Sequence, residues 1–179
     1  MCCSSSLKTR NEKVSIVTLA YNAVSTLGEV FDKAIRSALN QDYPDIEVIV
    51  VDNGSSDNTF DYVKMMYGDR VKIIRLPKNY GYCLGNNLAL KYTSNSRYVL
   101  FQNPDAILAR DYVKKLVEVL EQNPDVAAIQ GLEFHPSRKR FRIGGLLNTA
   151  GYSVDILPQQ DGNSLLCSEA LFAFGAAFL

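Results

Sequence analysis

The sequence predicts an α/β domain with a mostly parallel β-sheet and helices on both faces. Two observations carry this prediction. Short apolar and β-branched runs alternate with segments of helical periodicity from residue 14 onward, and the links between them are short. The run at residues 46–51 is almost wholly apolar, which is typical of a parallel strand buried on both of its faces.

The order of the elements follows from these runs. Apolar residues recur at the spacing of one helix face from Leu27 to Leu39, which predicts a helix after the first strand. Strands are expected at residues 14–19, 46–51, 71–76, 97–102 and 126–130. Helices are expected at residues 27–39, from 57–59 to about 67, around 84–92 and over 113–120. The interrupted apolar pieces at residues 134–157 favour hairpins or an irregular insertion.

Composition limits the class of protein. The chain has 179 residues, 47% of them hydrophobic and 21% charged, so a core can form and disorder is excluded for most of its length. We expect a disordered tail over residues 1–13 and one domain over residues 14–179. Lys plus Arg and Asp plus Glu each number 19, and this balance weighs against nucleic acid as a partner.

The cysteines and the leader region indicate a reducing compartment. Four cysteines without a CxxC, and a single histidine, weigh against a zinc site and against a disulfide framework. The N-terminus has no apolar leader, and no apolar run approaches the ~20 residues of a membrane span. We expect a cytoplasmic protein, with peripheral contact at the inner face of the membrane as an alternative. The basic residues at 138–142 favour a solvated hairpin, the alternative being contact with an anionic lipid-linked acceptor or a membrane surface.

Polar residues follow the first four expected strands, at the point where each strand ends. Because ligands of open α/β sheets bind beyond the carboxyl ends of the strands, these residues predict a binding site. The sequence has no dinucleotide-binding GxGxxG after the first strand, no P-loop and no GxSxG elbow. A phosphate group would therefore have to be bound in another way. A carboxylate that holds a divalent cation can do so, because such a cation prefers oxygen ligands and bridges phosphates.

Four motifs in order resemble the family 2 glycosyltransferases of GT-A fold, an open Rossmann-like sheet. They are VSIVTLAYN at residues 14–22, VVDNGSSD at 50–57, NYG at 79–81 and FQNPD at 101–105. The resemblance covers residues 14–179. The Asn-Pro-Asp form and the Asp-Asn turn are most similar to the rhamnosyltransferase-like branch. Any one motif alone is a weak signal, whereas four in order are specific.

The resemblance implies an activity and a set of site residues. It implies a UDP- or dTDP-sugar donor, a glycan or lipid-linked acceptor, Mg²⁺ or Mn²⁺, and inversion at the anomeric carbon. The metal ligand that it implies is Asp105, the one carboxylate kept in the family's metal motif. The following asparagine of the family's third motif matches Asn86 or Asn87. The residues implied for nucleotide binding are Tyr21, Asn22, Asp52, Asn53, Asn79, Gly81, Asn87, Asn103 and Asp105.

Several of these residues also have a simpler interpretation. Asp105 stands in an Asn-Pro-Asp turn, and the same tripeptide recurs at residues 123–125, where no function is expected. Asp52 could belong to the turn that starts a helix, and Tyr21 could pack against the sheet. The four motifs together favour the functional interpretation.

The resemblance also implies that the catalytic base is an Asp or Glu beyond residue 179. Inversion needs a base to deprotonate the acceptor hydroxyl. The chain is therefore expected to be truncated at its C-terminus, to carry the donor half, and to be weakly active at best. The alternative is a non-catalytic nucleotide-binding remnant or an interaction subunit. A sugar nucleotidyltransferase is disfavoured, because residues 21–24 do not form a Gly-rich, Arg-containing loop.

Overall fold

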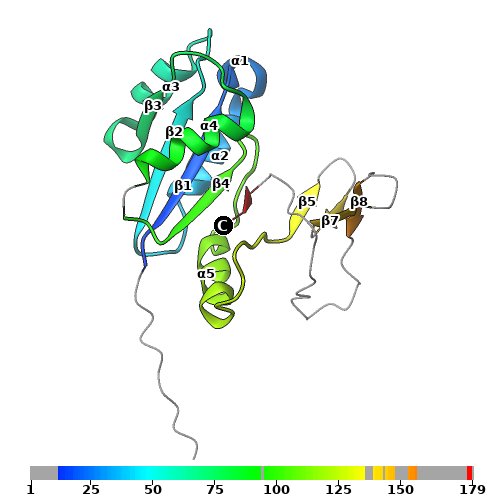
Figure 1. Ribbon diagram of the computed structural model, residues 1–179. Helices are drawn as coiled ribbons and strands as arrows, with labels where there is room; N and C mark the ends of the chain where they lie inside the picture. Colours follow the sequence, from blue (N-terminus) through cyan, green and yellow to red (C-terminus); the bar gives the residue numbers. More distant parts are fainter. Residues whose placement is uncertain are drawn as a thin grey trace, which may run out of the picture.

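A five-stranded sheet forms the centre of the computed structural model, which describes residues 12–93, 95–135, 139–142, 144–147, 153–156 and 177–178. The spatial order is β3-β2-β1-β4-β9 (Figure 1). The first four strands run parallel and β9 runs antiparallel to β4. The strands are β1 (Val14–Ala20), β2 (Ile46–Asp52), β3 (Lys72–Arg75), β4 (Tyr98–Gln102) and β9 (Ala177–Phe178). The predicted α/β fold with a mostly parallel sheet is confirmed.

Helices cover both faces of this sheet. One face packs against α1 (Ala23–Leu27), α2 (Glu29–Leu39), α3 (Thr59–Tyr67) and α5 (Tyr112–Gln122). The other packs against α4 (Gly81–Ala89) and the short 3-10 helix η2 (Leu90–Tyr92). A second 3-10 turn, η1 (Gly68–Arg70), follows α3. The alternation along β1 produces the two layers, since Ile16 points to the first face and Val17 to the second.

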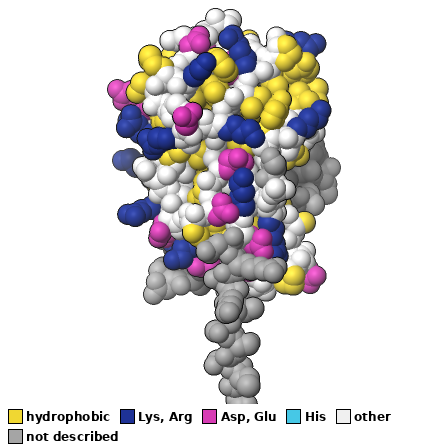
Figure 2. Space-filling view, turned by 90° about the vertical axis from the view of Figure 1, so that its left-hand side faces the viewer, with side chains coloured by type: hydrophobic (Ala, Val, Ile, Leu, Met, Phe, Trp, Pro, Cys, Tyr) yellow, Lys and Arg dark blue, Asp and Glu magenta, His cyan; other side chains and the backbone are white. Residues whose placement is uncertain are grey.

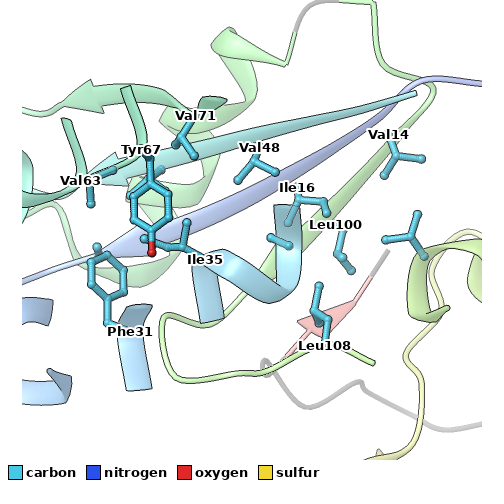
Figure 3. Close-up of a cluster of buried hydrophobic side chains, with 14 of the residues drawn as sticks. Val14, Ile16, Phe31, Ile35, Val48, Val63, Tyr67, Val71, Leu100 and Leu108 are labelled. Atoms are coloured by element: carbon cyan, nitrogen blue, oxygen red, sulfur yellow. The ribbon is translucent and has the colours of Figure 1, made fainter. Parts of the chain in front are cut away.

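The larger core lies under α2 and α3. Phe31 and Ile35 of α2 are fully buried against strand residues such as Ile16 and Val48 (Figure 3). Tyr67 at the end of α3 closes this layer and places its hydroxyl toward α2 (Figure 3). Burying apolar area of this kind contributes ~25 cal/mol per Å², and it fixes the helices that precede and follow the strand ends.

The predicted helix over residues 27–39 is interrupted at its start. Gly28 has φ +51° and separates α1 from α2, so the periodic segment forms two helices. Val30, which lies inside α2, is 40% exposed, although the apolar spacing predicted that it would face the sheet. A residue with positive φ cannot continue an α-helix, and glycine adopts this conformation with little strain.

The predicted fifth strand at residues 126–130 is wrong. The segment contains no strand, and only Gln130 forms an isolated bridge. A turn in which the Val126 N–H donates to Asn123 O starts the segment, and Ala127 and Ala128 are exposed. The place beside β4 is taken instead by β9, which pairs with Phe101 and Gln102. An apolar run shows that a segment can form a strand, but not which segment pairs with a given edge.

Two small antiparallel pairs lie in the part of the chain where hairpins were expected. They are β5 (Glu133–His135) with β6 (Arg140–Arg142), and β7 (Gly144–Leu147) with β8 (Ser153–Ile156). Within the basic run, β6 holds Arg140 and Arg142, whereas Arg138 lies outside the described residues. The predicted tail also lies outside them, except for Glu12 and Lys13.

The outer edge of the sheet carries charge. Lys72 and Arg75 stand in the edge strand β3, and charged side chains at such an edge oppose pairing with another chain. The face of the molecule on this side has Lys and Arg interspersed with Asp and Glu (Figure 2). Within the described ranges, every helix is too short or too polar to cross a membrane.

Candidate functional site

The strand order places one set of loops together. β1 lies between β2 and β4, so the order of the sheet reverses at β1, and ligands of α/β sheets bind at such a switch point. The register pairs Ala20 with Asp52, and Asp52 with Arg75, so the ends of β1, β2 and β3 are level. The loops after these strands and after β4 therefore meet at one edge of the sheet.

Asp52 ends β2 and has no solvent-accessible surface. Its Oδ1 accepts a hydrogen bond from the Ser55 N–H at 3.0 Å. Its Oδ2 lies 3.4 Å from Nε of Arg75 and has no hydrogen-bond partner among the described residues. A buried carboxylate oxygen that accepts no hydrogen bond is destabilising even beside an opposite charge, so this atom at the sheet edge indicates a place for a donor group.

Arg75 is a site residue that the sequence analysis missed. Its side chain is 49% exposed, its Nη2 donates to Ser55 O at 3.3 Å, and its guanidinium lies 5.3 Å from the centre of the Phe60 ring. It therefore covers Asp52 from the solvent side. Only the strand register brings Arg75 beside Asp52, because the two residues are far apart in the sequence.

Asn53 joins the loop after β2 to the loop before α4. Its Nδ2 donates to Asn79 Oδ1 at 3.0 Å and to Gly81 O at 3.3 Å, and its Oδ1 accepts from the Tyr80 N–H at 3.0 Å. Asn79 Oδ1 also accepts from the Gly81 N–H at 2.8 Å. The structure thus brings together Asn53, Asn79 and Gly81, and it gives the buried Asn53 amide a positioning role. Nucleotide binding by these three residues stays a prediction.

Gly54 allows these two loops to touch. It has φ +72°, and a Cβ on its backbone would lie 2.4 Å from the carbonyl carbon of Lys78. Lys78 itself lies with its Nζ 5.3 Å from the centre of the Tyr80 ring. Only glycine fits both the conformation and the approach.

Asn22 holds the loop after β1 against the loop after β2. It adopts the left-handed conformation with φ 48°, and its N–H donates to Ser55 Oγ at 2.9 Å. Its Oδ1 accepts from the N–H groups of Ser56 at 2.8 Å and Asp57 at 3.4 Å. Asn22 is predicted to bind a nucleotide, but in the structure its side-chain oxygen is used within the protein. Tyr21 beside it is 47% exposed, so its ring faces solvent at the site and can stack on a ligand.

Asp57 fixes the far side of the same loop. Its Oδ2 accepts from the Ser25 N–H and its Oδ1 from the Thr59 N–H, which links α1 to the start of α3. Burial raises the pKa of Asp57, but the hydrogen bonds from Thr59 and Ser25 outweigh it and hold the pKa below the ordinary value. The carboxylate stays ionised and closes the turn that leads into α3.

Asn103 and Asp105 follow β4. Asp105 is exposed, and Asn103 Oδ1 is buried with no hydrogen-bond partner among the described residues. A carboxylate oxygen and an unpaired amide oxygen suit a hard divalent cation, which binds few protein groups when phosphates and water fill the other positions. The described residues contain no cluster of three or more His, Cys, Asp or Glu side chains that could hold such an ion. The cation would therefore depend on the diphosphate of a ligand for its remaining oxygens.

The two asparagines of α4 differ in their surroundings. Asn86 is buried and its Nδ2 donates to Tyr82 O at 3.0 Å inside the helix. Asn87 is exposed. Of the two residues that the third motif could match, Asn87 is therefore the one with a side chain open to a ligand.

Comparison with known proteins identifies the family. Residues 15–178 match the model of Glycosyl transferase family 2. The chain belongs to this family. It is 31% identical over 118 residues to an uncharacterized glycosyltransferase of Haemophilus influenzae, covering 65% of this chain and 35% of that protein. It is 32% identical over 114 residues to the UDP-Glc:alpha-D-GlcNAc-diphosphoundecaprenol beta-1,3-glucosyltransferase WfaP of Escherichia coli, covering 62% and 42%. The matched part of the chain thus spans less than half the length of each of these relatives.

Solved structures of glycosyltransferases share the fold. S. aureus TarS in complex with UDP-GlcNAc is similar at 26% identity and TM-score 0.54, over 63% of this chain and 32% of that one. The mannosyltransferase PcManGT from Pyrobaculum calidifontis in complex with GDP-Man and Mn²⁺ is similar at 24% identity and TM-score 0.60, over 72% and 37%. The parallel sheet with helices on both faces is therefore that of a GT-A family 2 glycosyltransferase domain, as the sequence predicts.

Proposed function

We propose that this chain is the donor-binding part of a metal-dependent, inverting glycosyltransferase with a UDP- or dTDP-sugar donor and a glycan or lipid-linked acceptor. The observation that carries the proposal is the buried Asp52, whose Oδ2 has no hydrogen-bond partner among the described residues at the carboxyl edge of a parallel sheet. Family membership supports a transferase. The rhamnosyltransferase-like branch and the cytoplasmic location stay predictions.

The environment of Asp52 favours a base with an imide N–H. Such a group, present in uracil and thymine, can donate to Asp52 Oδ2, and the neighbouring guanidinium of Arg75 can donate to a base carbonyl. Arg75 has to swing outward to admit the base, and its half-exposed side chain has room to do so. Tyr21 supplies an exposed ring for stacking. Two of the proteins named above support this donor class, since WfaP is named for UDP-Glc and a TarS structure contains UDP-GlcNAc. PcManGT contains GDP-Man instead, so GDP is included in the test below.

The diphosphate would lie at the end of β4. Asp105 and Asn103 would hold a Mg²⁺ or Mn²⁺ ion there. When bound, that ion neutralises the charge on the leaving diphosphate. We assign no catalytic base within the described residues, and a base beyond residue 179 stays a prediction.

A thermal-shift series tests the donor site. The full chain is melted with UDP, dTDP, GDP and ADP, each with and without Mn²⁺ or Mg²⁺. A ligand at ~100 times its Kd adds about 2.7 kcal/mol, which is a shift of about 5–10 °C for a domain of this size. We expect a shift with UDP or dTDP that requires the metal. No shift with any nucleotide, from a chain that melts cooperatively, would contradict the proposal and favour an interaction subunit.

A matched pair of variants tests the metal ligand. Asp105→Asn should abolish the metal-dependent part of the shift and leave the unliganded melting temperature within about 1 °C, because exposed substitutions change stability little. Asp125→Asn is the control, since Asp125 is exposed and stands in the same Asn-Pro-Asp tripeptide after α5. Unchanged metal dependence in Asp105→Asn would remove Asp105 from the site.

A further inference from the structure

Gln102, the last residue of β4, forms a network of buried hydrogen bonds and has no role in the donor site proposed above. It is 2% exposed and directly precedes the Asn103-Pro104-Asp105 turn. Its Oε1 accepts from Thr18 Oγ1 at 3.2 Å, in the strand paired with it. Its Nε2 donates to Ala34 O of α2 at 3.1 Å and to Ala106 O at 2.6 Å. One amide therefore joins β1, α2 and the loop that carries Asp105.

The loop after β4 is also hydrogen-bonded to Ser37 of α2 and to Gln41, which follows α2. Ser37 Oγ accepts from the Leu108 N–H at 2.9 Å, and it donates to Ala34 O at 2.7 Å. Gln41 Nε2 donates to Ala109 O at 2.8 Å. These bonds hold the part of the loop that is distant from Asp105, whereas Gln102 holds the part next to it. The Ala106 N–H closes the turn by donating to Asn103 O at 3.0 Å.

Glutamine is an unexpected residue at the buried position 102. An apolar side chain there would not have to lose its hydration, whereas an amide does. Burying an amide is unfavourable unless its donors and acceptor are paired. Here both N–H groups and the oxygen have partners, so the amide forms a satisfied network of the kind that fixes one geometry. The exposed Asp105 gains its position from the backbone of the turn, and that backbone is tied at Ala106 by Gln102.

We propose that Gln102 is the positioning residue of the cation site, setting the Asn103–Asp105 turn against α2 so that Asp105 is held where it can bind the ion. This inference rests on the proposed function, because it takes Asp105 as a metal ligand. Groups that orient metal ligands typically change metal affinity by about 10–100-fold when they are removed.

Gln102→Leu is the decisive variant, with Ser15→Ala as its matched control. Leucine fills the same space but cannot donate to Ala106 O. Ser15 is equally buried in β1 and bonds to Glu47 and Ser96 at the opposite end of the sheet. The Mn²⁺ concentration that gives half of the UDP-dependent thermal shift is measured for both, together with the Kd for uridine in metal-free buffer. We expect Gln102→Leu to raise the Mn²⁺ midpoint by about tenfold or more and to leave the uridine Kd unchanged.

The outcomes separate this inference from the proposed function. If Gln102→Leu and Ser15→Ala both lower the melting temperature while the Mn²⁺ midpoint stays at the wild-type value, Gln102 is only a structural residue and the inference is overturned. If the wild-type chain itself shows no Mn²⁺ dependence, the metal part of the proposed function fails and this inference fails with it. If Gln102→Leu does not fold, Thr18→Val takes its place. It removes the donor to Gln102 Oε1 and should raise the midpoint by a smaller factor, and an unchanged midpoint there overturns the inference.

Discussion

The Nε atom of Arg75, at the end of β3, lies 3.4 Å from Oδ2 of Asp52, at the end of β2. The carboxylate has no accessible surface, whereas the arginine side chain is half-exposed. The buried charge of Asp52 is therefore compensated by Arg75, whose half-exposed side chain can move away from the carboxylate. Under the proposed function, movement of Arg75 would make Asp52 available to a ligand, and in the free protein the carboxylate stays paired.

Removal of the arginine should reveal the destabilising effect of the buried carboxylate. For Arg75→Met we expect the free energy of unfolding to fall by about 1–3 kcal/mol at pH 7, because a buried acceptor then lacks its opposite charge. Urea unfolding followed by circular dichroism measures this loss.

Arg36→Met is the control for this variant. Arg36 pairs with Asp32 at 2.6 Å, but Asp32 also accepts hydrogen bonds from the hydroxyls of Tyr62 and Tyr67. Its carboxylate keeps those partners when the arginine is removed, so the loss should be smaller. Equal losses in the two variants would show that Arg75 does not compensate Asp52.

Glycine at position 54 should be required for the contact between the loops after β2 and β3. Gly54→Ala adds strain at φ +72° and drives the new Cβ against Lys78. We expect a loss of more than about 2 kcal/mol in the free energy of unfolding, together with loss of UDP binding.

Gly68→Ala separates the conformational effect from the steric one. Gly68 has φ +51°, but a Cβ added to its backbone would meet no heavy atom within 4 Å. Its loss should come from conformation alone and be smaller than that of Gly54→Ala. Similar losses at both glycines would contradict a steric role for Gly54.

Asn22 should matter through its side-chain oxygen. Asn22→Asp keeps an acceptor for the N–H groups of Ser56 and Asp57, while Asn22→Gly keeps only the left-handed backbone. We expect hydrogen exchange at these two amides to accelerate in Asn22→Gly and to stay near the wild-type rate in Asn22→Asp. Faster exchange in both variants would show that the neighbouring acidic side chain of Asp57 makes a charge at position 22 unacceptable.

The decrease in the free energy of unfolding at acidic pH should depend on Asp32. Burial raises the pKa of Asp32, but hydrogen bonds from Tyr67, Arg36 and Tyr62 lower it by more, so it lies below the ordinary 3.8. A depressed pKa stabilises the folded protein above the unfolded value, and this contribution is lost as the pH falls through the folded value. Unfolding free energies measured between about pH 5 and pH 2 should therefore fall less steeply for Asp32→Asn than for the wild type. Parallel curves would show that Asp32 titrates alike in both states.

Much of the fold follows from local pattern. The helical spacing that begins at Leu27 correctly places Phe31, Ile35 and Ala38 in the core, because the period of 3.6 residues puts them on one face. The all-apolar centre of β2 correctly predicts a strand covered on both faces. The segment at residues 126–130 was mispredicted, because pairing with β4 is decided between distant parts of the chain and not by the run itself.

The candidate site divides in the same way. The sequence by itself determined the polar strand ends, since each one follows an apolar run directly, and it placed Asp52 and Asp105 at one edge of a parallel sheet. Only the tertiary structure decided that Arg75 covers Asp52, that Asn22 uses its oxygen to hold a neighbouring loop, and that Gln102 ties the turn after β4 to α2. The physical reason is that strand positions are encoded by local periodicity, whereas hydrogen bonds between side chains depend on register and packing across many residues of chain.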